Sequence, residues 1–181
     1  VALIAPVINF FGNAIGGVLV PVLAVKVWTA SSVQYGALEG TFPLGFAIGA
    51  GLYMLFAKHI QRRGLLMFAT MLAASAIFAV VPLMPTIMAA MPLSILAGMF
   101  LAVPNVLFQV LVQSEAPAEV QGRIFGVMGS LFSLTAPVAF MLAGRLADII
   151  SPVTVSVAFG VLLLASVLLA MMVSPALRRY R

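Results

Sequence analysis

The chain has 181 residues, of which 64% are hydrophobic and 7% charged, and its mean hydropathy is +1.25. Because soluble domains carry about 25% charged residues, this composition excludes a water-soluble globular protein. The net charge is +5, but the nine Lys and Arg residues fall in short clusters between apolar spans, a pattern of membrane topology rather than of nucleic-acid binding.

Six apolar spans follow one another along the chain, each of a length suited to crossing a hydrocarbon core of about 30 Å as a helix. Only short polar or proline-containing segments separate them, so neighbouring helices should be antiparallel in one bundle with no internal soluble domain. The predicted fold is an all-α integral membrane domain of six transmembrane helices. The spans are 2–28, 34–57, 65–82, 87–112, 120–147 and 152–174.

The first three spans differ in composition: the first has a polar stripe, the second is rich in glycine and the third is apolar. The first carries Asn9 and Asn13 four residues apart, on one helical face with Gly16. The second holds Glu39, the only acidic residue placed inside a span, about two turns from its outer end. The third is almost entirely apolar. The second span is also rich in glycine: Gly36, Gly40, Gly45, Gly49 and Gly51.

The next three spans repeat this order. The fourth has a polar stripe that includes Asn105 and Gln109, beside Pro104, which can loosen the backbone. The fifth is rich in glycine and the sixth is apolar. One face of the fifth has small residues at i+4 and i+3 spacing, so that another helix can approach closely there. They are Gly122, Gly126, Ser130, Ser133 and Pro137.

A repeat of three crossings has a geometric consequence. Because each unit crosses the membrane an odd number of times, the second copy must be inverted relative to the first. We therefore expect the six transmembrane helices to form two inverted three-helix repeats.

The basic residues predict the orientation. Cytoplasmic loops carry an excess of Lys and Arg, which makes both termini cytoplasmic. Trp28 and Tyr35 then lie near the outer interface and Tyr180 near the inner one. The cytoplasmic side would carry Lys58, Arg62, Arg63, Arg123, Arg178, Arg179 and Arg181, and the outer side only Lys26 and Arg145.

Two segments resemble a known family. The fifth span is entered through APAEVQGRIFGV and left through APVAFMLAGRLAD, and these segments resemble the fifth helix of the C-terminal half of major facilitator superfamily transporters, especially the macrolide-efflux-like drug:proton antiporters. The linker AKHIQRRG also resembles that family's loop between the second and third helices of a half, without its acidic residue and first glycine. The residues that match the helix entry and exit are Pro117, Glu119, Gly122, Arg123, Gly144, Leu146, Ala147 and Asp148.

The resemblance implies a larger protein. A complete transporter of this type has about twelve spans, with the substrate pathway between two six-helix domains. Spans one and four would line the pathway, two and five would flank it, and three and six would face lipid. The resemblance thus implies a missing N-terminal half, and the start at Val1 without an initiator Met suggests a fragment, although processing could give the same start. A half-sized transporter that pairs with a second copy is the alternative. No cleavable signal peptide is visible.

Glu39 is the candidate for proton coupling, since a carboxylate inside a membrane must pair, face water or be protonated. The alternative is that it reaches an outer aqueous vestibule or pairs with Lys26. Four amides are candidates for lining the substrate cavity, although amides within membranes also join helices to one another. They are Asn9, Asn13, Asn105 and Gln109.

The charged residues at the span ends have two interpretations. Lys58, Arg62 and Arg63 either hold cytoplasmic ends together in one transport state or serve topology and bind lipid headgroups. Glu119 with Arg123 and Arg145 with Asp148 are spaced for local pairs at i+4 and i+3, as gating residues or as helix caps and anchors.

No catalytic or metal site is expected. The chain has no cysteine, and its single histidine, His59, lacks partners for a metal site or a triad. The sequence has no nucleotide-binding motif, and we expect no cofactor. The predicted function is proton-coupled export of amphipathic or hydrophobic small molecules by alternating access, in a bacterial inner membrane, with lipid, substrate and protons as partners. A non-transporting membrane scaffold is the main alternative, and an intramembrane enzyme ranks lowest.

Overall fold

The computed structural model describes residues 4–174, almost all of which are helical, and this part of the chain contains no strand. Six of its helical segments are long and apolar enough to cross a membrane, which confirms the predicted fold. The first is continuous from α1 through the π-helix η1 into α2. The elements are α1 Ile4–Ala14, η1 Ile15–Leu19, α2 Val20–Lys26, α3 Ser32–Phe56, η2 Ala57–His59, α4 Arg63–Val80, η3 Val81–Leu83, α5 Ile87–Glu115, α6 Ala118–Ile149 and α7 Pro152–Val173.

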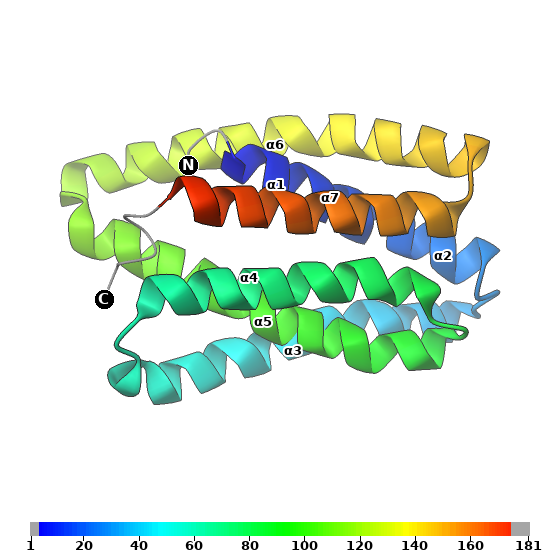
Figure 1. Ribbon diagram of the computed structural model, residues 1–181, viewed down its shortest axis with the longest axis horizontal. Coiled ribbons are helices and arrows are strands. Elements are labelled where there is room, and N and C mark those ends of the chain that lie inside the picture. The colour runs from blue at the N-terminus through cyan, green and yellow to red at the C-terminus, as the bar shows by residue number, and fades with distance from the viewer. Residues whose placement is uncertain (1–3, 175–181) are drawn as a thin grey trace.

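The helices run side by side and the chain reverses at each connection (Figure 1). The connections from α3 to α4 and from α5 to α6 lie at one end of the bundle. Those from α2 to α3, from α4 to α5 and from α6 to α7 lie at the other end. Lys58, Arg62, Arg63 and Arg123 therefore share one end, and Lys26 and Arg145 share the opposite end. Arg178, Arg179, Tyr180 and Arg181 lie outside the described residues.

The packing order of the helices is symmetric. Helix α5 packs between α3 and α4, α1 packs between α6 and α7, and α4 packs directly on α7. The first triplet consists of α1 with α2, α3 and α4, and the second of α5, α6 and α7. Exchanging the two triplets maps the α3–α5 contact onto α6–α1 and the α4–α5 contact onto α7–α1, and it leaves the α4–α7 contact unchanged. The two triplets are thus interleaved, because the middle helix of each packs on the first helix of the other. Their repeated composition is also a repeated packing pattern.

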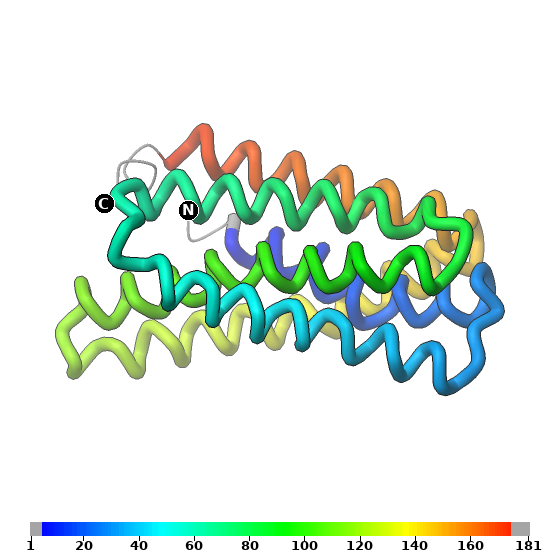
Figure 2. Tube along the Cα trace, turned by 90° about the horizontal axis from the view of Figure 1, so that it is seen from below, coloured from blue at the N-terminus to red at the C-terminus, as the bar shows by residue number. Residues whose placement is uncertain are grey.

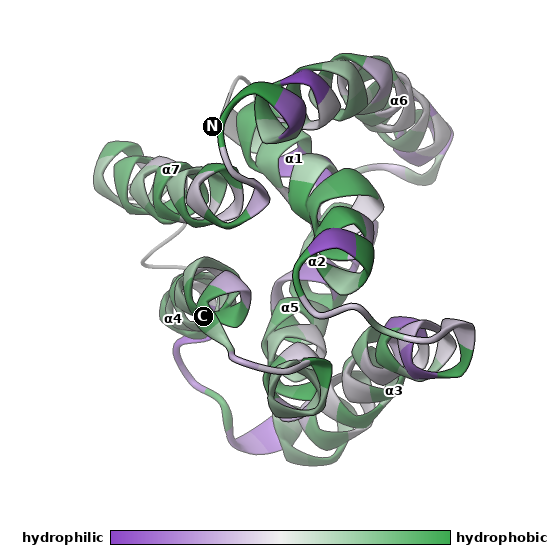
Figure 3. Ribbon diagram, turned by 90° about the vertical axis from the view of Figure 1, so that its right-hand side faces the viewer, coloured by the Kyte–Doolittle hydropathy of each residue, from purple (hydrophilic) through white to green (hydrophobic). Residues whose placement is uncertain are grey.

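The two sides of the bundle differ in how closely their helices approach one another. Helices α4 and α7 run together along one side (Figure 2). Seen along the bundle, α3 and α6 are far apart on the opposite side, and most of each ribbon is hydrophobic (Figure 3). Large apolar side chains are exposed along every helix of the bundle, as expected where the surrounding medium is lipid rather than water.

The π-helix η1 interrupts the first span. The amide of Val20 donates to the carbonyl of Ile15, five residues back, instead of four. Pro21 follows directly; because proline has no N–H, the carbonyl of Gly17 cannot accept the usual helical hydrogen bond from it. The wide turn accommodates this defect, whereas Pro43, Pro104 and Pro137 lie inside continuous α-helices.

The end of the bundle that carries Lys26 is held by a tryptophan. Trp28 is buried, and its indole Nε1 donates to the carbonyl of Met84 at 2.9 Å, which joins the connection after α2 to the connection before α5. Helix α3 then starts with a capping box, in which Ser31 and Gln34 satisfy each other's backbone amides.

Candidate functional site

Asn9 connects two helices of different triplets. Its Oδ1 accepts a hydrogen bond from Asn13 Nδ2 at 2.7 Å within α1, and it lies 2.9 Å from the hydroxyl of Thr135 on α6. All three side chains are half-buried. The network lies one turn before the π-helix η1, so the polar stripe of the first span adjoins the irregular part of its backbone.

Thr135 was not predicted from the sequence as a site residue. Its hydroxyl also lies 2.8 Å from the carbonyl of Phe132 in its own helix, and because a hydroxyl has one hydrogen, it can donate to only one of the two oxygens at a time. The signal in the sequence is a hydroxyl residue two positions before Pro137. Threonines in membrane helices usually bond to their own backbone, so this signal alone does not identify a partner.

The amide side chains of α5 are not covered by other parts of the described chain. Asn105 and Gln109 are exposed, one turn apart, and Asn105 Nδ2 donates to the carbonyl of Leu101 in the same helix at 2.8 Å. Within the described residues, no hydrogen bond links this pair to Asn9 or Asn13. The four amides therefore form two separate groups. One group joins α1 to α6, and the other lies on an uncovered face of α5.

Glu39 lies on α3, two turns from its first residue, Ser32, as expected. Its side chain is exposed, and within residues 4–174 it forms no ion pair. The cation proposed as its alternative partner, Lys26, binds elsewhere. Glu39 therefore has no neutralising cation among the described residues.

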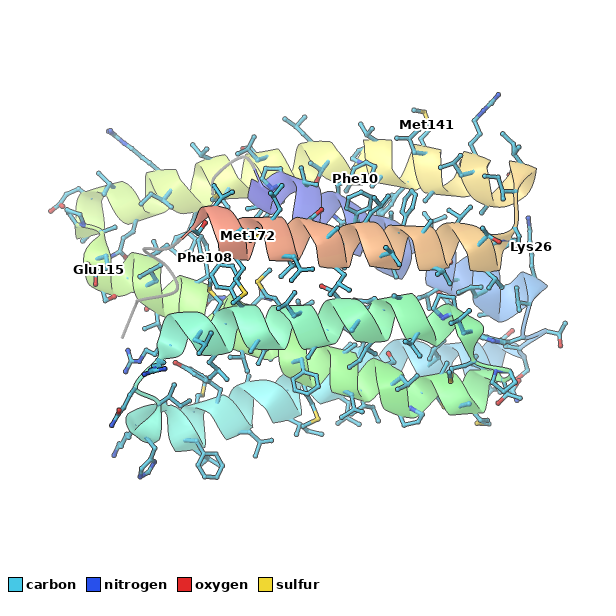
Figure 4. The ribbon with its side chains drawn as sticks, viewed as in Figure 1. Phe10, Lys26, Phe108, Glu115, Met141 and Met172 are labelled. Atoms are coloured by element: carbon cyan, nitrogen blue, oxygen red, sulfur yellow. The ribbon has the colours of Figure 1, made fainter. Side chains whose placement is uncertain are left out.

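Lys26 forms an ion pair with Asp148. The Lys26 Nζ lies 2.8 Å from Asp148 Oδ1, and both side chains are more than half exposed, at 54% and 71%. Lys26 ends α2 and Asp148 is near the end of α6, so the pair joins the two triplets at one end of the bundle, where Figure 4 labels Lys26. The structure thus gives Asp148 a different partner from the expected Arg145, which forms no ion pair among the described residues.

At the opposite end of the bundle, the charged side chains of the described residues form no ion pairs. Lys58 and Arg62 are exposed, and Arg63 is half-buried. Glu119 and Arg123 are also exposed, and the i+4 ion pair expected between them is not among the contacts of the described residues. This end therefore presents separate charges on the α3–α4 connection and at the start of α6.

Two glycines of α3, Gly45 and Gly49, mediate close packing with α5, whereas the other glycines of α3 and those that begin α6 have no atom within 4 Å of a Cβ. A Cβ at Gly45 or Gly49 would overlap the backbone of α5, and one at Gly98 would overlap the backbone of α3. By contrast, Gly122 and Gly126 have no neighbouring atom within 4 Å of a Cβ. The small-residue face predicted on α6, which includes Ser130 and Pro137, is exposed within this chain.

The arrangement has no feature of a hydrolytic or redox centre in the part of the chain that the structure describes. No group of three or more His, Asp or Glu side chains there could hold a metal ion. The candidate polar groups are instead the amides of α1 and α5, the carboxylate of Glu39 and the charges at the helix ends.

The chain is similar to curated transport proteins. It is 32% identical over 177 residues to Enterobactin exporter EntS of Escherichia coli O1:K1 / APEC, an alignment that covers 92% of this chain and 42% of that relative. The same protein of Citrobacter koseri is 32% identical over 164 residues, which is 91% of this chain and 39% of the relative. The chain therefore spans less than half the length of these relatives. No protein-family model and no solved structure matches it.

Proposed function

We propose that this chain is the C-terminal six-helix half of a major-facilitator-type exporter. The supporting observation is its 32% identity, along 92% of its length, to proteins named as exporters that are more than twice as long. The interleaved triplets agree with inverted repeats of secondary transporters. The other half then belongs to the remainder of a longer protein, and the membrane is the bacterial inner membrane, with the end that carries Arg62 and Arg63 in the cytoplasm.

The substrate pathway in this proposal runs along the side of the bundle away from α4 and α7. Asn105 and Gln109 are exposed on α5 and have amide groups that can bind a solute. Asn9 contributes less directly, because its oxygen already has two donors nearby. The proposed substrates are amphipathic or hydrophobic small molecules. Enterobactin, the compound in the name of the relatives, is the first to assay.

Glu39 is the proposed coupling group. It would bind a proton when exposed to one side and release it to the other, as carboxylates inside proton-coupled transporters do. Its exposure and its lack of an ion-pair partner in residues 4–174 support this role. A carboxylate neutralised by Lys26 would be a poorer proton acceptor, but Lys26 pairs with Asp148.

The test is substrate-dependent proton flux in liposomes that contain the full-length protein. We expect enterobactin or amphipathic cations to drive proton movement and Glu39→Gln to abolish it. Glu115→Gln, which removes an exposed acid at the other end, should leave it within about twofold. Flux that persists in Glu39→Gln would remove Glu39 from the mechanism. The absence of flux with every substrate would favour the non-transporting scaffold instead.

A further inference from the structure

An apolar groove opens between α3, α4 and α5 near the end of the bundle that carries Arg62. Its volume is about 180 Å³, which exceeds the roughly 150 Å³ of an apolar cavity that can hold benzene. Thr70 adjoins it, but the threonine hydroxyl lies within hydrogen-bond distance of two backbone carbonyls of α4 and leaves the walls apolar. The main lining residues are Leu52, Tyr53, Ile60, Leu66, Phe100 and Val103.

The groove reaches the basic connection between α3 and α4. Ile60 belongs to both, and Lys58, His59 and Arg62 around it are exposed. Figure 3 shows this connection as hydrophilic against the hydrophobic helices. An occupant of the groove therefore lies next to a concentration of positive charge.

No ion pair neutralises this positive charge within residues 4–174. There is no ion pair there to Lys58, Arg62 or Arg63. In addition, the Nε of Arg63 is buried and has no hydrogen-bond acceptor. Glu115 and Glu119 lie at the same end of the bundle, yet they pair with none of the three. A buried donor without an acceptor is costly, so an anion from outside the chain would stabilise this site.

A single molecule with an anionic head and an apolar chain matches both parts. Water in the groove would be unfavourable because the walls are apolar. A free anion could bind at the basic connection, but it would leave the apolar groove empty. A membrane phospholipid supplies a phosphate at the depth of the connection and an acyl chain at the depth of the helices. The cytoplasmic leaflet, in which the proposed topology places this end, is rich in anionic lipids.

We propose that the groove and the connection together form a binding site for one anionic phospholipid. Lys58, Arg62 and Arg63 hold the phosphate, and the acyl chain lies in the groove against Leu66 and Val103. The site is separate from Glu39 and from the amides of α1 and α5. Its occupancy is therefore measured by binding and does not depend on the outcome of a transport assay.

Native mass spectrometry of the full-length protein tests the site by counting bound lipids during titration with phosphatidylglycerol or phosphatidylcholine. We expect retention of one phosphatidylglycerol in preference to phosphatidylcholine. Because a basic residue near an anionic lipid contributes about fivefold in affinity, Arg62→Gln and Lys58→Gln should each weaken retention by about that factor. Arg123→Gln is the matched control; it removes the same charge at the same end but lies outside the groove, and it should change retention by less than twofold.

Two further measurements distinguish lipid bound in the groove from lipid retained elsewhere on the protein. Val103→Phe fills the groove and should reduce lipid retention at least about fivefold, with Leu66→Phe as the second variant if the first does not fold. Inorganic phosphate at millimolar concentration should not displace the lipid. Equal losses in Arg123→Gln and Arg62→Gln, equal retention of both lipids, full displacement by phosphate, or retention unaffected in both groove variants would each overturn the proposal.

Discussion

Helices α3 and α6 occupy equivalent positions in the two triplets, and both are rich in glycine, but they use their glycines differently. In α3, Gly45 and Gly49 allow the backbone of α5 to approach so closely that a Cβ would overlap it. In α6, no atom lies within 4 Å of a Cβ at Gly122, Gly126 or Gly129. Glycine content therefore marks a face suited to close approach, and it does not say whether the same chain covers that face.

The contact of α6 with α1 has a different chemical basis. It is made in the second half of α6 by Ala139, Ala143 and Ala147, all buried. The bond between Asn9 and Thr135 lies just before them. Met141, on the same half of α6, points away from the bundle (Figure 4). The small-residue face in the first half of α6 is exposed within the described residues.

The strongest test of this comparison is Gly49→Ala against Gly51→Ala. Both glycines are in α3, but only at Gly49 does a Cβ overlap the backbone of Met99. Overpacking of this kind costs about 1 to 3 kcal/mol, whereas alanine at Gly51 should be neutral or slightly stabilising because it favours the helix. Thermal unfolding of the purified protein in detergent measures both. Equal midpoints would show that α3 and α5 can separate without cost.

Cysteine labelling tests whether α6 is covered in the full-length protein. This chain contains no cysteine, so Gly126→Cys and Met141→Cys each introduce one thiol into it; any cysteine elsewhere in the protein is first replaced by serine. We expect a lipid-soluble maleimide to react about tenfold more slowly at 126, because another part of the protein packs there, than at 141, which faces away from the bundle. Equal rates would mean that the first half of α6 faces lipid, and the proposed contact would be wrong.

The polar link between α1 and α6 has a smaller expected effect. A double-mutant cycle of Asn9→Ala and Thr135→Val should give a coupling of about 0.6 kcal/mol, the average for hydrogen bonds between membrane helices. Asn105→Ala is the matched control, because its bond stays within α5 and should not couple to Thr135. Reversible unfolding in bicelles measures the cycle. A coupling of zero would mean that Thr135 donates to Phe132 instead of Asn9.

The ion pair of Lys26 and Asp148 should contribute least. Both side chains are more than half exposed, so solvent screening limits the coupling of Lys26→Gln with Asp148→Asn to under about 1 kcal/mol, and salt should reduce it further. The same cycle with Arg145→Gln should show no coupling. If Arg145 rather than Lys26 coupled to Asp148, the local pair expected from the sequence would be correct.

Much of the fold could be predicted from local sequence. Each helix is apolar over enough residues to cross a membrane, and short connections force neighbouring helices to be antiparallel. Even the internal prolines Pro43, Pro104 and Pro137 did not end their helices, because hydrophobic length outweighs one lost hydrogen bond in lipid. The π-helix at 15–19 was not predicted, since its register depends on how Gly17 packs against Phe140 as well as on Pro21.

The sequence by itself determined the six helices, their inverted repeat and the separation of charge between the two ends, because these follow from composition over windows of a few turns. The tertiary structure decided which partners meet: Lys26 with Asp148, Asn9 with Thr135, and the glycines of α3 with α5. It also placed an apolar groove beside Arg62. These contacts depend on the rotation and spacing of helices distant in sequence, and no local pattern encodes either quantity.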